Sequence, residues 1–131
     1  MDFDSIDKGS MPLPPAKIKS RGELMVIYQG DQYSIPFVIK RKGEKVTPDT
    51  VSDVVIAIGD IVRAYSEGTF TYSTADGVWL FPIYREETLK LPNDASYQIE
   101  IHVGKDVIHS KEYPIKLKTI LDSLKERAYS D

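Results

Sequence analysis

The stretch GDIVRAYSEGTFTYSTADGVWLFPIY, residues 59–84, decides the fold class. Short β-branched and aromatic runs alternate in it with three turn signals, Gly59-Asp60, Glu67-Gly68 and Asp76-Gly77. Glycine accepts a positive φ at such turns without steric cost, and Asp-Gly between alternating residues is a strong hairpin signal. Three closely spaced turns therefore predict an antiparallel meander. They disfavour alternating βαβ units, because those units place helices between the strands.

Further strand-like runs lie on both sides of this meander. They are ELMVIYQ (23–29), YSIPFVIKRK (33–42), VSDVVIAI (51–58), SYQIEIHV (96–103) and VIHSKEYPIKLK (107–118). Residues 85–94 break the alternation and predict a helical turn or loop. About seven short antiparallel strands, with turn signals every 8–12 residues or so, are typical of an immunoglobulin-like β-sandwich. We therefore predict an all-β, Ig-like sandwich with a short C-terminal helix.

The chain divides by composition into three parts. Residues 1–20 contain several prolines, which favour an extended path, and predict a flexible arm. Residues 21–118 form the predicted sandwich, and residues 119–131 show a helical period. The apolar residues of this last segment are expected to contact the sandwich or another subunit, and its possible interaction residues are Ile120, Leu121 and Leu124.

Composition narrows the class of protein further. The chain has 131 residues, one domain in size, and a net charge of -3, which disfavours nucleic acid as a partner. It has no cysteine, so disulfides, thiol nucleophiles and zinc–thiolate sites are ruled out. The start, MDFDSIDKGS, lacks the features of a signal peptide, and no window has the roughly 18 apolar residues of a membrane span. We expect synthesis in a cytoplasm and no membrane association.

The pair Gly30-Asp31 is interpreted as a strand-to-strand corner in which the aspartate caps the turn. A calcium site would need several clustered carboxylates, and none follow Asp31 at the required spacing. The same reasoning assigns structural turn roles to a set of residues along the chain, namely Gly30, Asp31, Gly59, Gly68, Asp76, Gly77 and Gly104.

Candidate catalytic and metal-binding residues are few. His102 and His109 flank the Gly104 turn, but two imidazoles without a third ligand make a poor zinc site, so they are interpreted as exposed strand residues. Glu86 and Glu87 are adjacent in a loop and do not point at a common atom, as glycoside hydrolysis would require. Nucleophile-elbow, zinc-protease and phosphate-loop motifs are missing from the sequence. We therefore predict a protein that is not an enzyme and has no catalytic residues, cofactor or metal.

Aromatic and basic residues leave alternatives open. Trp79 and the eight tyrosines are explained by strand packing, or by an exposed patch that binds sugar or protein. The basic clusters at 17–21 and 40–45 are explained by lysines that protect sheet edges. A carbohydrate-binding or host-surface adhesion module that uses Trp79 is thus the second hypothesis. A small hydrolase is the third.

Residues 26–118 resemble a family of small structural proteins of tailed phages and prophages of Gram-positive bacteria. The resemblance lies in Tyr28 to Asp31, Thr47-Pro48, Ile58-Gly59, Gly68 to Tyr72, Trp79, and Glu86 to Thr88. The chain is also distantly similar to the Ig-like N-terminal modules of phage baseplate proteins. The resemblance implies a non-enzymatic virion or tail-associated component, whose partners would be other virion proteins or further copies of itself. Its motifs are turn and packing residues, so they imply a fold more directly than a mechanism.

Overall fold

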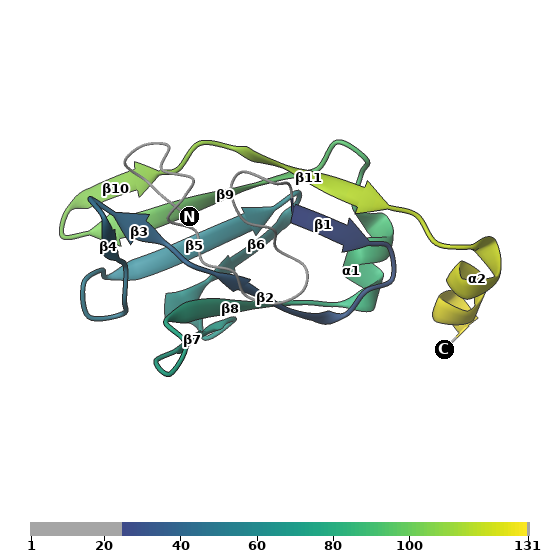
Figure 1. Cartoon of the computed structure of the whole chain (residues 1–131), viewed down its shortest axis with the longest axis horizontal. Coiled ribbons are helices and arrows are strands. Elements are labelled where there is room, and N and C mark those ends of the chain that lie inside the picture. Colours follow the sequence, from purple (N-terminus) through teal and green to yellow (C-terminus); the bar gives the residue numbers. More distant parts are fainter. Residues whose placement is uncertain (1–24, 131) are drawn as a thin grey trace.

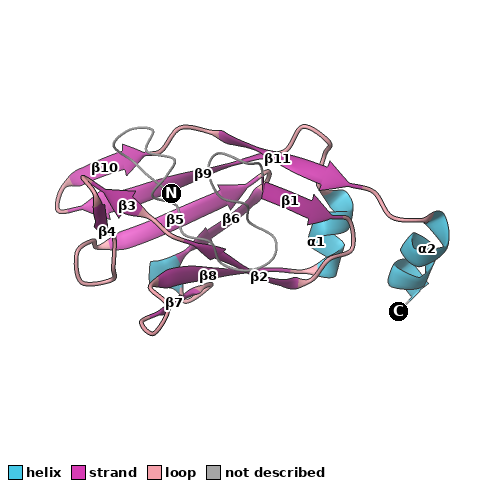
Figure 2. Cartoon of the chain, viewed as in Figure 1, coloured by secondary structure: helices cyan, strands magenta, loops and turns pink. Residues whose placement is uncertain are grey.

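The computed structural model of the protein describes residues 25–130. The predicted arm, residues 1–20, lies outside the described part of the chain. Strands dominate the described residues and form two main sheets that pack face to face, with short helices at the ends of strands (Figures 1 and 2). The fold is thus an all-β sandwich with a C-terminal helix, as the sequence predicted.

The larger sheet has the strand order β1-β11-β9-β5-β6, and β10 also pairs with β9. The strands are β1 (Met25–Tyr28), β5 (Asp53–Ile58), β6 (Ile61–Ala64), β9 (Ser96–Val103), β10 (Asp106–His109) and β11 (Tyr113–Lys118). Only the β1·β11 pair is parallel within this sheet; its other pairs are antiparallel. The first described strand and the last are therefore neighbours.

The smaller sheet has the order β2-β8-β7, and a short hairpin, β3-β4, stands apart from it. These strands are β2 (Tyr33–Phe37), β3 (Lys40–Arg41), β4 (Glu44–Lys45), β7 (Thr71–Ser73) and β8 (Val78–Ile83). The helices are the 3-10 turn η2 (Tyr65–Glu67), α1 (Arg85–Lys90) and α2 (Asp122–Ser130). The segment that the sequence assigned to a helical turn or loop thus contains α1.

The strand order is that of an immunoglobulin-like sandwich. In such a domain the second strand pairs with the fifth and the third pairs with the sixth, so that consecutive strands divide between the sheets. Here β2, β8 and β7 form one sheet, whereas β5, β9 and the β10–β11 segment form the other. The number of strands exceeds the predicted seven or so, because the chain contributes a short extra hairpin and its last strand is split in two.

The core lies between the inner faces of the two sheets. Strand β5 buries every second residue, and β9 repeats this alternation opposite it. The smaller sheet contributes large side chains that are fully buried, including Ile35, Phe37, Trp79, Phe81 and Ile83. Burying one such side chain contributes about 1.5–3 kcal/mol. The alternation in the sequence thus places one apolar face of each sheet in a shared interior.

Most turn residues predicted from the sequence lie at or near the ends of strands, whereas Gly68 ends the 3-10 turn η2. Asp31 accepts a hydrogen bond from the Tyr28 N–H at Oδ2 (3.3 Å), and its own N–H donates to the Tyr28 carbonyl (3.1 Å). Asp76 similarly bonds to the Ser73 hydroxyl. Positive φ angles occur at Gly30, Gly59, Gly68, Gly77 and Gly104.

Two boundaries differ from the sequence expectation. Residues 107–118 were expected to form one strand, but they are interrupted between β10 and β11. At this interruption Ser110 bonds to β9. Its Oγ accepts a hydrogen bond from the Ile99 N–H (3.0 Å), and its own N–H donates to the Ile99 carbonyl (2.8 Å). Helix α2 begins at Asp122, where the Leu121 carbonyl accepts a helical hydrogen bond from the Lys125 N–H (3.1 Å).

Candidate functional site

A polar cluster on the outer face of the larger sheet is positioned by the Gly104-Lys105 turn. This two-residue turn sets the register of β9 and β10, so that His109 lies opposite Glu100 and Val107 lies opposite His102. Residues two apart on a strand point to the same face. Glu100, His102 and His109 therefore meet on one surface, and we call them the His–Glu–His cluster.

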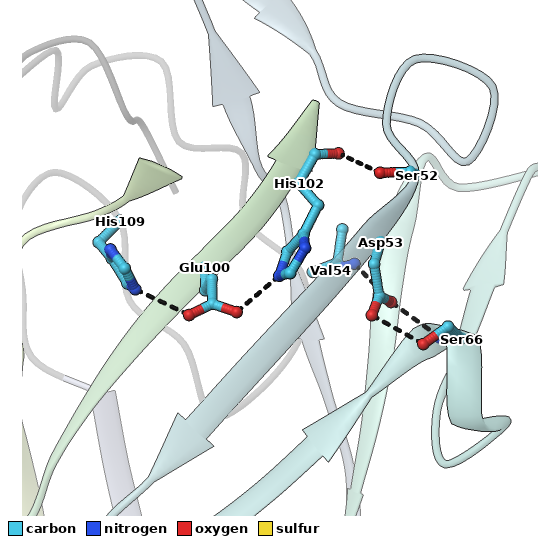
Figure 3. A network of polar contacts seen from close by, with 7 residues as sticks. All are labelled: Ser52, Asp53, Val54, Ser66, Glu100, His102 and His109. Carbon is cyan, nitrogen blue, oxygen red and sulfur yellow. Dashed lines mark hydrogen bonds and ion pairs between the residues drawn. The ribbon is translucent and has the colours of Figure 1, made fainter. Parts of the chain in front are cut away.

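The Glu100 carboxylate lies between the two imidazoles of the cluster (Figure 3). Its Oε2 is 2.6 Å from Nε2 of His102, and its Oε1 is 2.8 Å from Nε2 of His109. The hydrogen bond from His102 is the main reason that the pKa of Glu100 is lowered; burial opposes this shift and His109 adds to it. The cluster thus favours an ionised carboxylate at a surface that solvent reaches.

Asp53 on the neighbouring strand β5 is paired in register with His102, but its carboxylate serves another contact. It accepts hydrogen bonds from the Ser66 N–H (2.8 Å), the Ser66 hydroxyl (2.7 Å) and the Val54 N–H (2.8 Å) (Figure 3). Asp53 thereby fixes η2 to the sheet. Among residues 25–130, no group of three or more histidine, aspartate or glutamate side chains has the arrangement to hold a metal ion.

A partly buried ion pair joins the larger sheet to α1. Arg63 on β6 donates from one nitrogen to both carboxylate oxygens of Glu87, at 3.0 and 2.8 Å, and the two side chains are 13% and 24% exposed. Glu87 also accepts the Tyr84 N–H (3.0 Å) at the start of α1. The guanidinium lies 5.1 Å from the Phe81 ring centre and 5.5 Å from that of Tyr84. Glu87 is thus committed to a structural role, and a hollow of about 560 Å³ lies beside the pair, between β6 and α1.

Sequence reasoning missed Arg63, although a signal was available. In β6 the alternation places Arg63 opposite the buried Ile56, on the inner side of the sheet. A charged side chain at an inward position needs a partner, since an unpaired buried charge is costly. The expected partner is a nearby carboxylate, and Glu86-Glu87 was the nearest acidic pair downstream in the sequence.

The predicted apolar residues at the C-terminus divide into two kinds. Ile120 is half-buried and packs near Gly30. A Cβ added to Gly30 would lie only 3.3 Å from Cδ1 of Ile120. Leu121 and Leu124, by contrast, are 73% and 52% exposed. Figure 1 shows that α2 lies beyond the end of β11 and projects from the sandwich. Two of the three predicted interaction residues are therefore accessible to a partner.

Trp79, the fourth predicted interaction residue, is fully buried. Its ring makes edge-on contacts with Tyr65, Phe70 and Tyr72 at centre distances of 5.0, 6.1 and 4.8 Å. Its indole N–H donates to the carbonyl of Val46 (3.0 Å). Of the two explanations left open for Trp79, strand packing is therefore the one that holds, because the side chain lies on the inner face of β8 and not in an exposed patch.

None of the helices in residues 25–130 is both long enough and apolar enough to cross a lipid bilayer. Comparison of the chain with protein-family models, with curated proteins and with solved structures found no match.

Proposed function

We propose that this chain is a non-enzymatic, Ig-like structural protein of a phage or prophage particle, and that it acts through protein–protein contacts made by α2. The observation that carries the proposal is the exposure of Leu121, directly before α2, and of Leu124, in the first turn of this projecting helix. The Leu124 N–H donates to the Leu121 carbonyl (2.9 Å), so the two exposed leucines lie together at the start of the helix.

The length of α2 supports a partner. The helix has nine residues, and isolated helices shorter than about 12–15 residues are marginal in water. Within the chain it is held by Ile120 and by its contact with α1. Burial of the two leucines on another protein would add about 1.5–3 kcal/mol each if it were complete. This is the physics of a short amphipathic helix that docks in an apolar groove.

The location in a virion rests on the resemblance of residues 26–118 to phage structural proteins. An Ig-like sandwich suits such a role, because it buries its own core and its last helix, α2, projects from it. The partner would be another virion protein or a further copy of this chain. Synthesis would take place in the cytoplasm of the bacterial host, before the protein enters the particle.

The two alternative functions have less support. The adhesion module depended on Trp79 as a stacking platform, and that side chain is inside the core. The hydrolase depended on paired carboxylates, and Glu87 is occupied by Arg63 and the Tyr84 N–H.

The proposal is tested in particles released by the bacterium that encodes the chain. We expect the wild-type protein to be recovered with the particles, and a Leu121→Asp, Leu124→Asp double variant to fold normally but to be lost from them. Ser123→Asp, on the same helix but outside the apolar pair, is the matched control and should be incorporated. Absence of the wild-type chain from the particles, or equal incorporation of both variants, would overturn the proposal.

A further inference from the structure

Strand β6 is an edge of the larger sheet, and it carries an exposed aliphatic side chain. Soluble proteins commonly protect edge strands with proline, charge or very short length. Strand β2, at the edge of the smaller sheet, contains Pro36, and β7 has three residues. In β6 the outward position is Val62, an aliphatic side chain that is 62% exposed.

The hydrogen-bond pattern of β6 leaves one peptide position open. The two-residue turn Gly59-Asp60 makes Ile58 and Ile61 the hydrogen-bonded pair beside the turn. Because such pairs alternate in an antiparallel ladder, the N–H and C=O groups of Val62 and Ala64 point away from β5. Both groups of Ala64 bond to the Thr69 hydroxyl, at 3.0 and 2.8 Å.

The N–H and C=O groups of Val62, which also point away from β5, have no such partner. Within residues 25–130, no hydrogen bond from another segment reaches the N–H or C=O of Val62. The edge of β6 is thus closed by Thr69 at one end and by the Gly59-Asp60 turn at the other. Val62, between these two ends, therefore offers its N–H as a donor and its C=O as an acceptor to another strand.

We propose that a second copy of this chain pairs with β6, antiparallel and centred on Val62. An antiparallel pair centred on one residue is two-fold symmetric, so the N–H of each Val62 donates to the C=O of the other and both open groups are used. Identical surfaces related by a two-fold axis form the commonest closed assembly. In this register, Asp60 of one copy lies opposite Ala64 of the other. Pairing between the copies ends at these positions, because each chain turns at Gly59-Asp60 and the Thr69 hydroxyl already bonds to the backbone of Ala64.

The side chains around Val62 suit contact between identical surfaces. The two exposed valines would face each other as an apolar cross-strand pair. The adjacent hollow is lined by apolar Ile61, Leu91 and Pro92, and its charged residues balance, with Arg63 and Lys90 against Asp60 and Glu87. Two copies therefore meet without net charge repulsion.

The contact is small, so the dimer is weak and forms at high local concentration, as among neighbouring subunits of a particle. Its residues differ from Leu121 and Leu124, so the pairing does not depend on the role proposed for α2.

The test is sedimentation equilibrium of the full chain over about 10–500 µM, a range that spans weak association constants. We expect reversible dimerisation of the wild type. Val62→Lys places a charge on the edge and Val62→Pro removes the open N–H, so each should weaken the dimer at least about tenfold. Val107→Lys changes a comparably exposed valine on β10 and is the matched control. Thermal unfolding shows that each variant is folded.

The control and Leu124→Asp should dimerise as the wild type does. A wild type that stays monomeric at every concentration would overturn the proposal. So would equal weakening by Val62→Lys and Val107→Lys. Loss of the dimer in Leu124→Asp with no effect of Val62→Lys would also overturn it, because association would then run through α2.

Discussion

The indole N–H of Trp79 donates a 3.0 Å hydrogen bond to the main-chain carbonyl of Val46, which directly follows the β3–β4 hairpin. The Val46 N–H in turn donates to the carbonyl of Ile39 (2.7 Å), just before that hairpin. Trp79 thereby ties a short peripheral hairpin to the centre of the core. The residue that appeared from sequence to be a candidate ligand contact is a structural anchor.

Substitution of Trp79 should separate its packing from its hydrogen bond. We expect Trp79→Ala to lower the free energy of unfolding by about 3–5 kcal/mol, because it leaves a large cavity. Trp79→Phe keeps most of the apolar contact but leaves the Val46 carbonyl unpaired, so it should cost about 1–3 kcal/mol. Urea denaturation measures both values. A negligible cost for Trp79→Phe would contradict the anchoring role of the bond.

The lowered pKa of Glu100 makes a prediction about pH. A carboxyl whose pKa is lower in the folded state stabilises the fold at pH values above its unfolded pKa, about 4.3, and loses that contribution as pH falls through the lowered value. Glu100→Gln should therefore destabilise the protein by about 1 kcal/mol at pH 7, and by less at pH 3. Urea denaturation at the two pH values measures the difference.

The two histidines provide the control for this pH effect. Because the hydrogen bond from His102 is the largest cause of the shift, His102→Asn should reduce the pH dependence more than His109→Asn does. The same cost of Glu100→Gln at both pH values would show that the carboxylate is not stabilised by the imidazoles.

The Arg63–Glu87 pair should show coupling, because it is partly buried and one guanidinium nitrogen lies 2.8 and 3.0 Å from the two carboxylate oxygens. In a double-mutant cycle with Arg63→Met and Glu87→Gln, we expect a coupling free energy above about 1 kcal/mol. Glu86→Gln, on the neighbouring exposed position of α1, should change stability by less than about 0.5 kcal/mol. Additive effects of the two pair substitutions would show that the ion pair does not join β6 to α1.

Two of the turn glycines should respond differently to alanine. Gly59 and Gly104 both have positive φ, so alanine is strained by about 1–2 kcal/mol at either. At Gly59 the new Cβ would also lie 3.1 Å from Cδ2 of Leu91, whereas at Gly104 it would meet open space. Thermal unfolding should therefore show a larger loss of stability for Gly59→Ala. Equal losses would indicate that Leu91 moves aside without cost.

The sequence predicted the sandwich well where local signals were sufficient. Alternation in β5 and β9, and glycine turns such as Gly77 and Gly104, depend on side-chain spacing and backbone conformation within a few residues. The parallel β1·β11 pairing was not predicted, because it joins residues about 90 positions apart. The interruption at Ser110 depends on a side-chain bond to another strand, which no local pattern indicates.

The candidate sites were only partly predictable. His102 and His109 were interpreted as exposed strand residues; His109 is exposed, whereas His102 is half-buried. The Gly104-Lys105 turn sets the register that brings His109 opposite Glu100. Leu121 and Leu124 were identified by helical spacing, but spacing alone did not separate them from Ile120, which packs near Gly30. Whether an aromatic residue such as Trp79 is a surface or a core residue depends on which face of its strand meets the other sheet.

The most direct test of the central claim is photo-crosslinking from position 124 in purified particles. A photoreactive amino acid at position 124 should form a covalent adduct with another virion protein or another copy of the chain, because docking through α2 places this side chain in an interface. The same group at Lys105, on the distant Gly104 turn, is the control and should give little adduct. Equal adduct yields from the two positions, or no adduct from position 124, would contradict the account.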